Sequence, residues 1–564
     1  MTWLFLLALA APVIEWRAEH ARPDPFGATV AVDKAAESKL VNWRSARGAY
    51  ASAHLVVRAA NYTLTIESPF PVDVYREWFH QIRGVYYPDA LIPATLPVQA
   101  RIPDPDNKIE GQTAQAYWVD VWVPADAKPG TYTVTAKAGS ETAAATLTVT
   151  QTLTPSGDTL SIDHNSYGSS FLAEQYPKLA AQFGEGWTQS DSFFELIHAY
   201  HRLFYEHRGI FHQLGYGHGG KVAPEFAPEL TGSGRNRKIA SWSLYDRHYG
   251  PLLDGSAFAK TRRGAQPIPF VYLPITPEWP ASFVNWGEPG YETEFVNVVR
   301  EMEKHFREKG WTKTRFELFF NHKKRYKAFP WDGDEVRFLE DDKYSKEYWR
   351  LWRAAIPSDT PVKFVFRSDS SWALEQQVKN LEGIVNFWVC SSGMLSWMPQ
   401  TARQAKARGD IVWHYSGPPA IQEKSTAITQ NLMRAWVWDI DGYIHWLTVA
   451  HGRDPWFAST GSDTGLVYSG ERFGMEIPLA SIRLKLQRNA LQDLAVLDRS
   501  KVAAAVKAYN GTTPDQWWNP RPAIADGPPN AVNNADIGDA ARPANRLLRR
   551  TDAAAWQRLR EVIP

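Results

Sequence analysis

The chain has 564 residues, of which 44% are hydrophobic and 22% charged, and its formal net charge is +1. This length predicts two or three domains, and the composition excludes a disordered chain. The balanced charge provides no basic footprint for a nucleic-acid partner. The 25 Trp residues are unusual, because flat apolar faces in such number serve either core packing or stacking on sugar rings.

The first 14 residues, MTWLFLLALAAPVI, form an apolar run that is too short to span a bilayer. The run and its small residues around Ala8 and Ala10 are typical of a secretory signal peptide cut after about residue 10. No later run of about 18 apolar residues occurs, so we expect no membrane span. We expect export to the periplasm or the cell exterior.

The one cysteine, Cys390, excludes an intrachain disulfide, and a buried structural thiol is favoured over a nucleophile.

Residues 15–152 have the pattern of a β-sandwich. Apolar or alternating segments occupy residues 55–58, 62–66, 116–124, 131–136 and 144–149. A turn signal, Ala127-Lys128-Pro129-Gly130, separates two of them. Short strands with Pro and Gly turns predict a sandwich that serves as a scaffold or as a glycan-binding accessory.

From residue 158 to 505 the pattern changes to strand followed by helix. Eight candidate strands occupy residues 160–164, 209–215, 268–274, 315–320, 362–367, 383–389, 410–415 and 442–447. Helical patterns lie at residues 192–206, 293–309, 343–355, 399–408 and 424–436. Eight such units predict a (β/α)₈ barrel, also called a TIM barrel, as the catalytic domain.

Polar and aromatic residues recur at the carboxyl ends of the predicted strands, where barrels carry their sites. They are Asn165, Tyr167, Tyr216, His218, Glu278, Asn321, His322, Asp369, Trp388, Tyr415, His445 and Trp446. Their recurrence at one edge favours function over chance. The long segment 217–266 carries Trp242, and a loop of this length is either a substrate wall or an ordered surface excursion.

The last part of the chain, residues 506–564, is rich in Pro, Ala and Asn. This composition predicts a tail that wraps the barrel or is partly disordered. A short terminal helix is expected within residues 552–562.

The stretch Arg315–Asp342 holds the strongest candidate for chemistry. Its strand leads into a loop dense in Lys and Arg, and the loop ends in acids that include the adjacent pair Asp334 and Glu335. Cations beside such a pair would hold one carboxylate ionised, while an apolar neighbour would keep the other protonated. The alternative is a solvated acidic loop.

Other motifs are weaker. Gly215–Gly220 matches G-x-G-x-x-G, but Pro224 and Pro228 interrupt the helix that a dinucleotide site needs. The histidines between residues 198 and 212 lack the spacing H-E-x-x-H, so we predict no metal site, and no cofactor is expected. No G-x-S-x-G elbow and no P-loop occur, which argues against an esterase or an NTPase.

Several segments are familiar in combination. They are Trp413–Tyr415, Arg434–Trp436, Asp441–Trp446, Asp454–Trp456, Gly465–Gly470, Ser481–Lys485, Gln492–Asp493, Trp118–Pro124 and Pro129–Tyr132. Together they resemble glycoside hydrolase family 123. The resemblance implies a β-sandwich followed by a catalytic barrel that releases β-linked N-acetylgalactosamine. In that family an adjacent Asp-Glu pair, usually followed by Pro, does the chemistry, and the matching residues here are Asp334 and Glu335, followed by Val336.

The resemblance also implies a mechanism. The 2-acetamido oxygen of the substrate would attack the anomeric carbon, Asp334 would orient that group, and Glu335 would be the general acid. An apolar wall such as Trp331 or Phe338 would favour the protonated acid. A substrate without the acetamido group would need a separate nucleophile or base. Candidates for that role are Glu278, Asp369 and Asp441.

The sequence therefore predicts an exported glycoside hydrolase whose partner is a glycan or polysaccharide. Expected substrate contacts are Asn321, His322, Lys323, Trp242, Asp369, Trp388, Tyr415, His445 and Trp446. Two alternatives are a non-catalytic glycan-binding protein on a hydrolase scaffold and a polysaccharide lyase with His322 or Tyr415 as its base.

Overall fold

The structure, a computed structural model, describes residues 13–38, 42–217, 221–282, 287–327, 329–336, 338–371, 374–449, 454–457, 465–518, 546 and 551–563. Residues 1–12 of the predicted signal peptide, His218 and most of the predicted tail between residues 519 and 550 lie outside these ranges. Within the described ranges, no helix is both long and apolar enough to cross a membrane.

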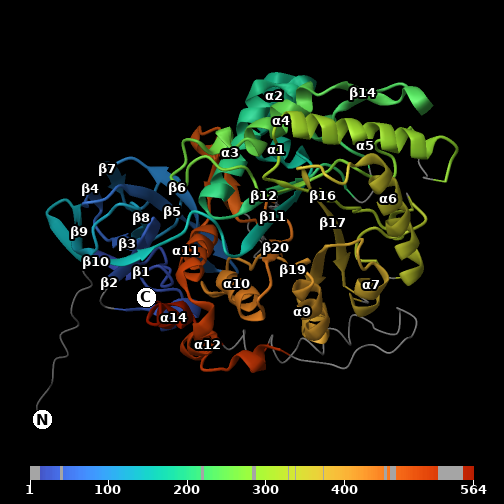
Figure 1. The fold of residues 1–564 in the computed structure, drawn as a ribbon. Helices are drawn as coiled ribbons and strands as arrows, with labels where there is room; N and C mark the ends of the chain where they lie inside the picture. The colour runs from blue at the N-terminus through green and yellow to red at the C-terminus, as the bar shows by residue number, and fades with distance from the viewer. Residues whose placement is uncertain are drawn as a thin grey trace, which may run out of the picture.

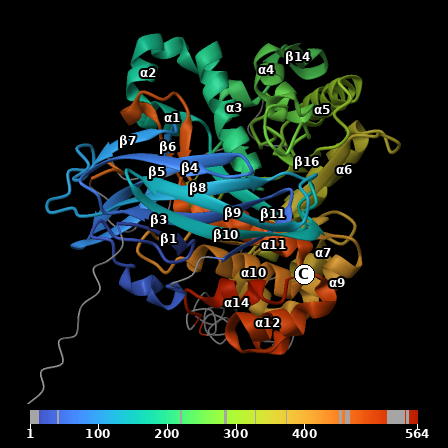
Figure 2. The same ribbon diagram turned by 90° about the vertical axis from the view of Figure 1, so that its left-hand side faces the viewer.

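The N-terminal region is built from two five-stranded sheets, shown in blue to cyan in Figures 1 and 2. Their strand orders are β1-β3-β8-β5-β6 and β2-β10-β9-β4-β7. The strands are β1 (Ile14–Ala18), β2 (Asn42–Arg47), β3 (Ala49–Val57), β4 (Asn61–Glu67), β5 (Val72–Ile82), β6 (Val85–Ala94), β7 (Val98–Arg101), β8 (Gln115–Val123), β9 (Gly130–Ala138) and β10 (Glu141–Leu153). Leu55 and Val119 of the first sheet share one buried cluster with Leu64 and Leu147 of the second. The sequence predicts a β-sandwich here, and a core shared by two sheets is its defining feature.

Strand β8 explains how this region joins the rest of the chain. Successive side chains of a strand point to opposite faces. Tyr117 and Val119 belong to the core between the two sheets. Trp118 belongs to a cluster made largely by the C-terminal half, and Asp120 binds Arg488 and Lys485 there. Both faces of β8 are therefore buried.

The C-terminal half forms a nearly closed barrel of eight parallel strands. Its order is β12-β11-β20-β19-β18-β17-β16-β15. The strands are β11 (Ser161–Tyr167), β12 (Ile210–Leu214), β15 (Phe270–Tyr272), β16 (Arg315–Leu318), β17 (Lys363–Ser370), β18 (Phe387–Ser391), β19 (Ile411–Ser416) and β20 (Gly442–His445). The gap falls between β12 and β15, where His212 stacks on Tyr272 with ring centroids 3.7 Å apart. Each of the eight predicted strands overlaps one of these, which is consistent with a (β/α)₈ barrel.

Helices lie between the barrel strands and cover the outside of the barrel (Figure 1). They are α1 (Ser170–Gln175), α2 (Pro177–Phe183), α3 (Asp191–Glu206), α4 (Ser243–Leu253), α5 (Tyr291–Glu308), α6 (Asp342–Ala355), α7 (Leu374–Asn380), α8 (Ser392–Trp397), α9 (Pro399–Ala407), α10 (Ala427–Trp438) and α11 (Ile482–Val496). The chain ends in α12 (Val502–Asn510) and α14 (Ala555–Arg560), the latter within the predicted terminal helix.

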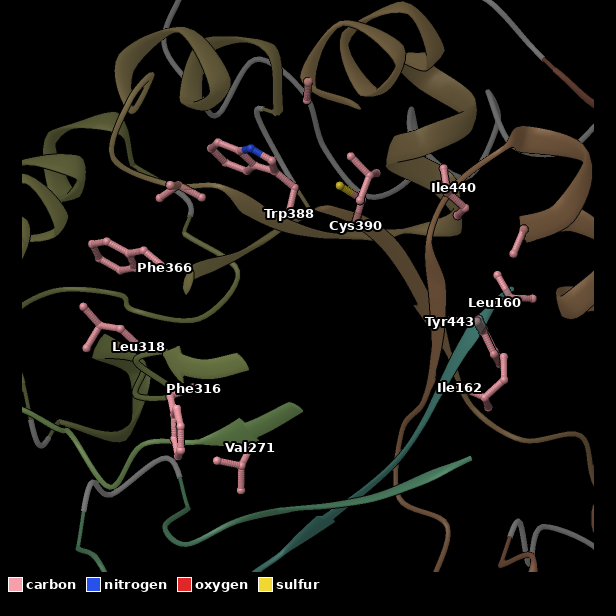
Figure 3. Close-up of a cluster of buried hydrophobic side chains, with 14 of the residues drawn as sticks. Leu160, Ile162, Val271, Phe316, Leu318, Phe366, Trp388, Cys390, Ile440 and Tyr443 are labelled. Carbon is pink, nitrogen blue, oxygen red and sulfur yellow. The ribbon is translucent and has the colours of Figure 1, made fainter. Parts of the chain in front are cut away.

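The barrel strands divide their side chains between two cores. Phe387 and Val389 of β18 lie in a small cluster with Trp413 and Ile444, inside the barrel. Trp388 of the same strand lies in the large cluster between barrel and helices (Figure 3). The period of two along each strand thus decides which side chains reach the barrel interior.

Helix α11 is wedged between the two halves of the protein, so it is buried on nearly every side. Its Arg488 and Lys485 bind Asp120 of the N-terminal region, and Arg483 binds Asp89 at 2.8 Å. Paired, hydrogen-bonded charges of this kind are costly to break singly. They fix the N-terminal sheets against the barrel.

The long segment after β12 forms part of the outer layer. It contains the hairpin of β13 (Glu229–Thr231) and β14 (Lys238–Ser241), followed by α4. Ile239 N–H donates to Glu301 of α5 at 2.8 Å. The hairpin therefore packs on α5, as Figure 1 shows.

Candidate active site

The loop after β16 returns to the mouth of the barrel. The N–H groups of Gly333 and Asp334 donate to the carbonyl oxygen of His322 at 2.9 and 3.2 Å. Gly333 passes so close to the backbone of Phe320 that a Cβ on Gly333 would lie 2.6 Å from the carbonyl oxygen of Phe320. Glu335 follows with a φ of +47°. This turn lets two consecutive side chains reach one point, which a regular strand prevents.

That point is the ammonium group of Lys323. Its Nζ lies 3.1 Å from Oδ2 of Asp334 and 2.5 Å from Oε2 of Glu335. The Tyr415 hydroxyl donates to Oε1 of Glu335, and it also lies 2.7 Å from the hydroxyl of Ser371. The Glu335 side chain is 31% exposed, whereas that of Asp334 is 7% exposed. Glu335 is thus the member of the pair that is open to solvent.

The two carboxyls have opposite pKa shifts. Burial raises the pKa of Asp334 to about 7, with the charges of Asp369 and Glu335 adding to the rise and Lys323 opposing it. Burial also acts to raise the pKa of Glu335, but the charge and hydrogen bond of Lys323 and the hydrogen bond of Tyr415 bring it below its ordinary value. At neutral pH the pair therefore holds one ionised carboxylate beside one carboxyl near its titration midpoint, an arrangement suited to acid/base work.

The apolar wall expected beside Glu335 lies elsewhere. Trp331 stacks on Tyr344 with centroids 4.7 Å apart, within the outer core. Phe338 lies 4.8 Å from Nζ of Lys324. The raised pKa consequently belongs to Asp334 and not to Glu335, because Lys323 and Tyr415 contact Glu335 directly.

A chain of charged side chains fills the barrel beneath the pair. Arg367 binds Asp369 at 2.7 Å and Glu317 at 3.1 Å, and His212 bridges Glu317 and Asp163 at 3.2 and 2.7 Å. Burial, with a contribution from Glu335, raises the pKa of Asp369 despite Arg367. Of these residues, only Asp369 is among the sequence candidates. The signal for the others is a charge at an inward position of an otherwise apolar strand.

Two further sequence candidates lie at the mouth. Asn321 is buried, and its N–H donates to the Tyr216 hydroxyl at 3.3 Å. Trp446 is 37% exposed and meets Tyr167 edge-on at 5.0 Å. Lys323 and Tyr415 contact the pair directly, and the charge of Asp369 acts on Asp334.

Two candidates on barrel strands face outward instead. The Trp388 indole donates to Asp410 at 3.1 Å in the layer between barrel and helices (Figure 3). His445 is fully buried and bonds Gln487 of α11 through Nε2 at 2.5 Å. Neither side chain converges on the pair, because each occupies the outward face of its strand.

Two more candidates are packed against other rings. His322 lies against Phe329 and Trp331, at 4.6 and 4.2 Å between centroids, so its contribution to the loop is its carbonyl oxygen. Trp242 stacks on His305 of α5 at 3.8 Å, in the outer layer. Asp441 accepts from the N–H of Val412 at 3.0 Å and pairs with Lys406 at 3.2 Å, and the Glu278 N–H donates to the Thr276 hydroxyl at 3.1 Å. In the described part of the chain, no group of three or more His, Cys, Asp or Glu side chains is placed to hold a metal ion.

Comparisons with known proteins show a shared fold. No family model matches the sequence, and no curated protein matches it. A family 123 glycoside hydrolase from Clostridium perfringens, studied for glycolipid glycan hydrolysis, has a similar structure at a TM-score of 0.60 and 11% identity, over 97% of this chain and 98% of that one. A putative alpha-galactosidase from Bacteroides fragilis covers 77% of this chain and 76% of its own, at 11% identity and a TM-score of 0.27. An FMN-binding beta-glucuronidase from Facaelibacterium prausnitzii covers 81% and 61%, at 10% identity and a TM-score of 0.31.

Proposed function

We propose that this protein is a glycoside hydrolase that cleaves β-linked 2-acetamido sugars, of the N-acetylgalactosamine type, with help from the substrate's own acetamido group. The observation that carries the proposal is the meeting of Asp334 and Glu335 on Lys323, with pKa values shifted in opposite directions. Two carboxyls whose environments separate their pKa values mark an acid/base site. The shared fold with an enzyme that hydrolyses glycolipid glycans supports the same class of reaction.

The proposed roles follow from exposure and charge. Glu335, the open member of the pair, gives a proton to the glycosidic oxygen as the bond to the anomeric carbon breaks. Asp334 accepts a hydrogen bond from the acetamido N–H, while the acetamido oxygen attacks the anomeric carbon. At neutral pH Glu335 is ionised and Asp334 is near its titration midpoint, so a proton on the pair resides on Asp334. Entry of the substrate must therefore move a proton from Asp334 to Glu335, beside the ammonium of Lys323 that contacts both.

Neither candidate base of the lyase alternative, Tyr415 or His322, is placed to accept a proton from a substrate. A lyase base must lose its proton near neutral pH. Burial and the charge of Glu335 hold the pKa of Tyr415 well above its ordinary value, and Tyr415 donates to Glu335. The other candidate base, His322, is packed between aromatic rings.

The first experiment separates the roles of the two carboxyls by leaving group. Glu335→Gln keeps the shape but has no transferable proton, so we expect a loss of roughly 10²- to 10⁴-fold on alkyl glycosides and a much smaller loss on 4-nitrophenyl glycosides. Asp334→Asn should slow both kinds of substrate alike, since it acts on the acetamido group. The reverse pattern would exchange the two roles, and equal activity of both variants and wild type would refute the site.

A second measurement tests the acetamido group itself. Fluorination of the acetamido methyl weakens the oxygen as a nucleophile, so the rate should fall steeply from acetamido to trifluoroacetamido substrates, and the first product should retain its anomeric configuration. If fluorination left the rate unchanged, the nucleophile would be another carboxylate. Asp369 is the candidate whose charge acts on the pair.

We also propose that the chain is exported, on the basis of its apolar first 14 residues. Mass spectrometry of the protein recovered from outside the cytoplasm should find a new N-terminus near residue 11. A cytoplasmic chain that begins at Met1 would contradict this.

A further inference from the structure

A large groove lies beside the mouth of the barrel. Its volume is about 1040 Å³, and its walls come from the end of β11, α1, the start of α2, the chain after β20 and residues 469–473. Asp106 of the N-terminal region completes one wall. Small-molecule sites occupy about 300–1,000 Å³, so this groove has room for more than a single sugar ring.

The groove lies next to the candidate active site, at the carboxyl ends of β11 and β20 in the same barrel. Tyr167 lines the groove, and its pKa is raised by burial and by the charge of Asp334. Trp446 contacts Tyr167 edge-on, and its backbone N–H donates at 3.0 Å to the carbonyl oxygen of Ser416, the residue after Tyr415. The groove and the pair's partner Tyr415 thus lie at neighbouring strand ends of the barrel mouth.

The walls combine aromatic faces with polar groups. Phe171, Trp456 and Phe473 are among the lining residues, beside Ser166 and Arg472. The hydroxyl of Ser166 is buried, at 1% exposure, and has no hydrogen-bond partner among the described residues. A buried hydroxyl without a partner is costly, so a ligand hydroxyl in the groove would stabilise it. Apolar ring faces with a few placed hydrogen-bonding groups suit carbohydrate.

The N-terminal sheets hold the far wall in place. The indole of Trp78 on β5 donates at 2.9 Å to the carbonyl oxygen of Trp456, and the two rings meet edge-on at 5.2 Å. On the opposite wall, Glu471 accepts from the N–H groups of Lys178 and Leu179 at 2.9 and 3.1 Å, at the start of α2. The groove is therefore formed before any ligand arrives.

We propose that this groove binds the sugar units next to the one whose bond is cleaved, so that the substrate is an oligosaccharide and the N-terminal sheets help to build its binding site. The proposal rests on the proposed function, because it places the cleaved bond at Asp334 and Glu335. A carbohydrate fits the mixed lining, whereas a lipid chain would leave the buried hydroxyl of Ser166 unsatisfied.

The test uses the full-length protein and oligosaccharides of two to four units, extended on either side of a β-linked 2-acetamido sugar. Ser166→Ala and Arg472→Ala should each raise KM for these about five- to twentyfold, as expected for lost hydrogen bonds. Both should change kcat/KM on the 4-nitrophenyl monosaccharide less than twofold. Arg235→Ala, an exposed arginine outside the groove lining, is the matched control.

Calorimetric titration of the same oligosaccharides into Glu335→Gln measures binding without turnover. Weaker binding after the groove substitutions supports the proposal. Equal effects on monosaccharide and oligosaccharide, or no effect on either, overturn it. If wild type cleaves none of these glycans, the proposed function fails by itself. Titration into wild type then still decides the groove, because binding that Ser166→Ala and Arg472→Ala leave unchanged would exclude it.

Discussion

The ammonium of Lys323 lies 2.5 Å from Oε2 of Glu335. The same ammonium contacts Asp334, so one cation sets the charge state of both carboxyls. Its effect is to lower both pKa values, against burial, which raises them. The pair's chemistry should therefore depend on Lys323 more than on any aromatic neighbour.

Replacement of Lys323 by Met should shift the pH dependence of kcat/KM, which reports the free enzyme. Loss of a cation within about 4–6 Å raises a carboxyl pKa by roughly one to three units. Both limbs of the profile should consequently move to higher pH. The measurement is kcat/KM on a 4-nitrophenyl glycoside over a wide pH range.

Lys324→Met is the matched control for this prediction. The neighbouring Lys324 directs its Nζ to Asp341 at 2.9 Å and not to Asp334 or Glu335. The pH profile of kcat/KM for Lys324→Met should coincide with that of wild type. A Lys323→Met profile that also coincides with wild type would show that Lys323 does not set the pKa values of the pair.

The barrel strands were accessible to sequence patterns because their apolar runs are bounded by polar segments. Side-chain direction was harder to predict, since a shift of one residue moves a side chain to the other face of the sheet. The predicted strand 383–389 puts Trp388 near its end, whereas β18 begins at Phe387 and continues to Ser391. Trp388 therefore lies early in the strand and faces outward, while Phe387 and Val389 face the barrel interior.

For Asp334 and Glu335 the residues could be predicted from the sequence, but their contacts could not. Asp334 and Glu335 are predictable as adjacent acids after a strand, but their approach to Lys323 depends on a loop that crosses Phe320 at Gly333. Nothing in the local pattern specifies such a contact between distant backbone segments. The opposite pKa shifts of Asp334 and Glu335 follow from that packing. The sequence predicts a raised pKa at Glu335 from an apolar wall, but the raised pKa is that of Asp334.

The two carboxyls should also have opposite effects on the pH dependence of stability. The pKa of Asp334 is about 7 in the folded protein, above its ordinary 3.8. A raised folded pKa contributes stability that is fully present below pH 3.8 and is lost as the pH rises to about 7. Asp334→Asn should therefore gain in Tm relative to wild type across this window, with its largest advantage above pH 7.

Glu335→Gln provides the contrast in the same calorimetric series, which runs from pH 3 to pH 8. The folded pKa of Glu335 lies below its ordinary 4.5, so the ionised group contributes stability above pH 4.5 that is lost as the pH falls through the folded pKa. This variant should have a lower Tm than wild type at neutral pH, and the deficit should shrink in acid. Parallel trends for the two variants would contradict the assigned shifts.

The close approach of Gly333 to Phe320 should be necessary for the position of Asp334 and Glu335. A Cβ there would lie 2.6 Å from both Cβ and the carbonyl oxygen of Phe320 and 2.9 Å from the ring of His322. Since these atoms belong to packed groups, Gly333→Ala should displace Asp334 and Glu335. A displacement of about 1 Å can lower the rate by roughly 10²-fold, so kcat/KM should fall by that order at temperatures well below the Tm. Gly186→Ala, where a Cβ meets nothing within 4 Å, should keep wild-type activity. Full activity in Gly333→Ala would mean that the pair's position does not depend on this crossing.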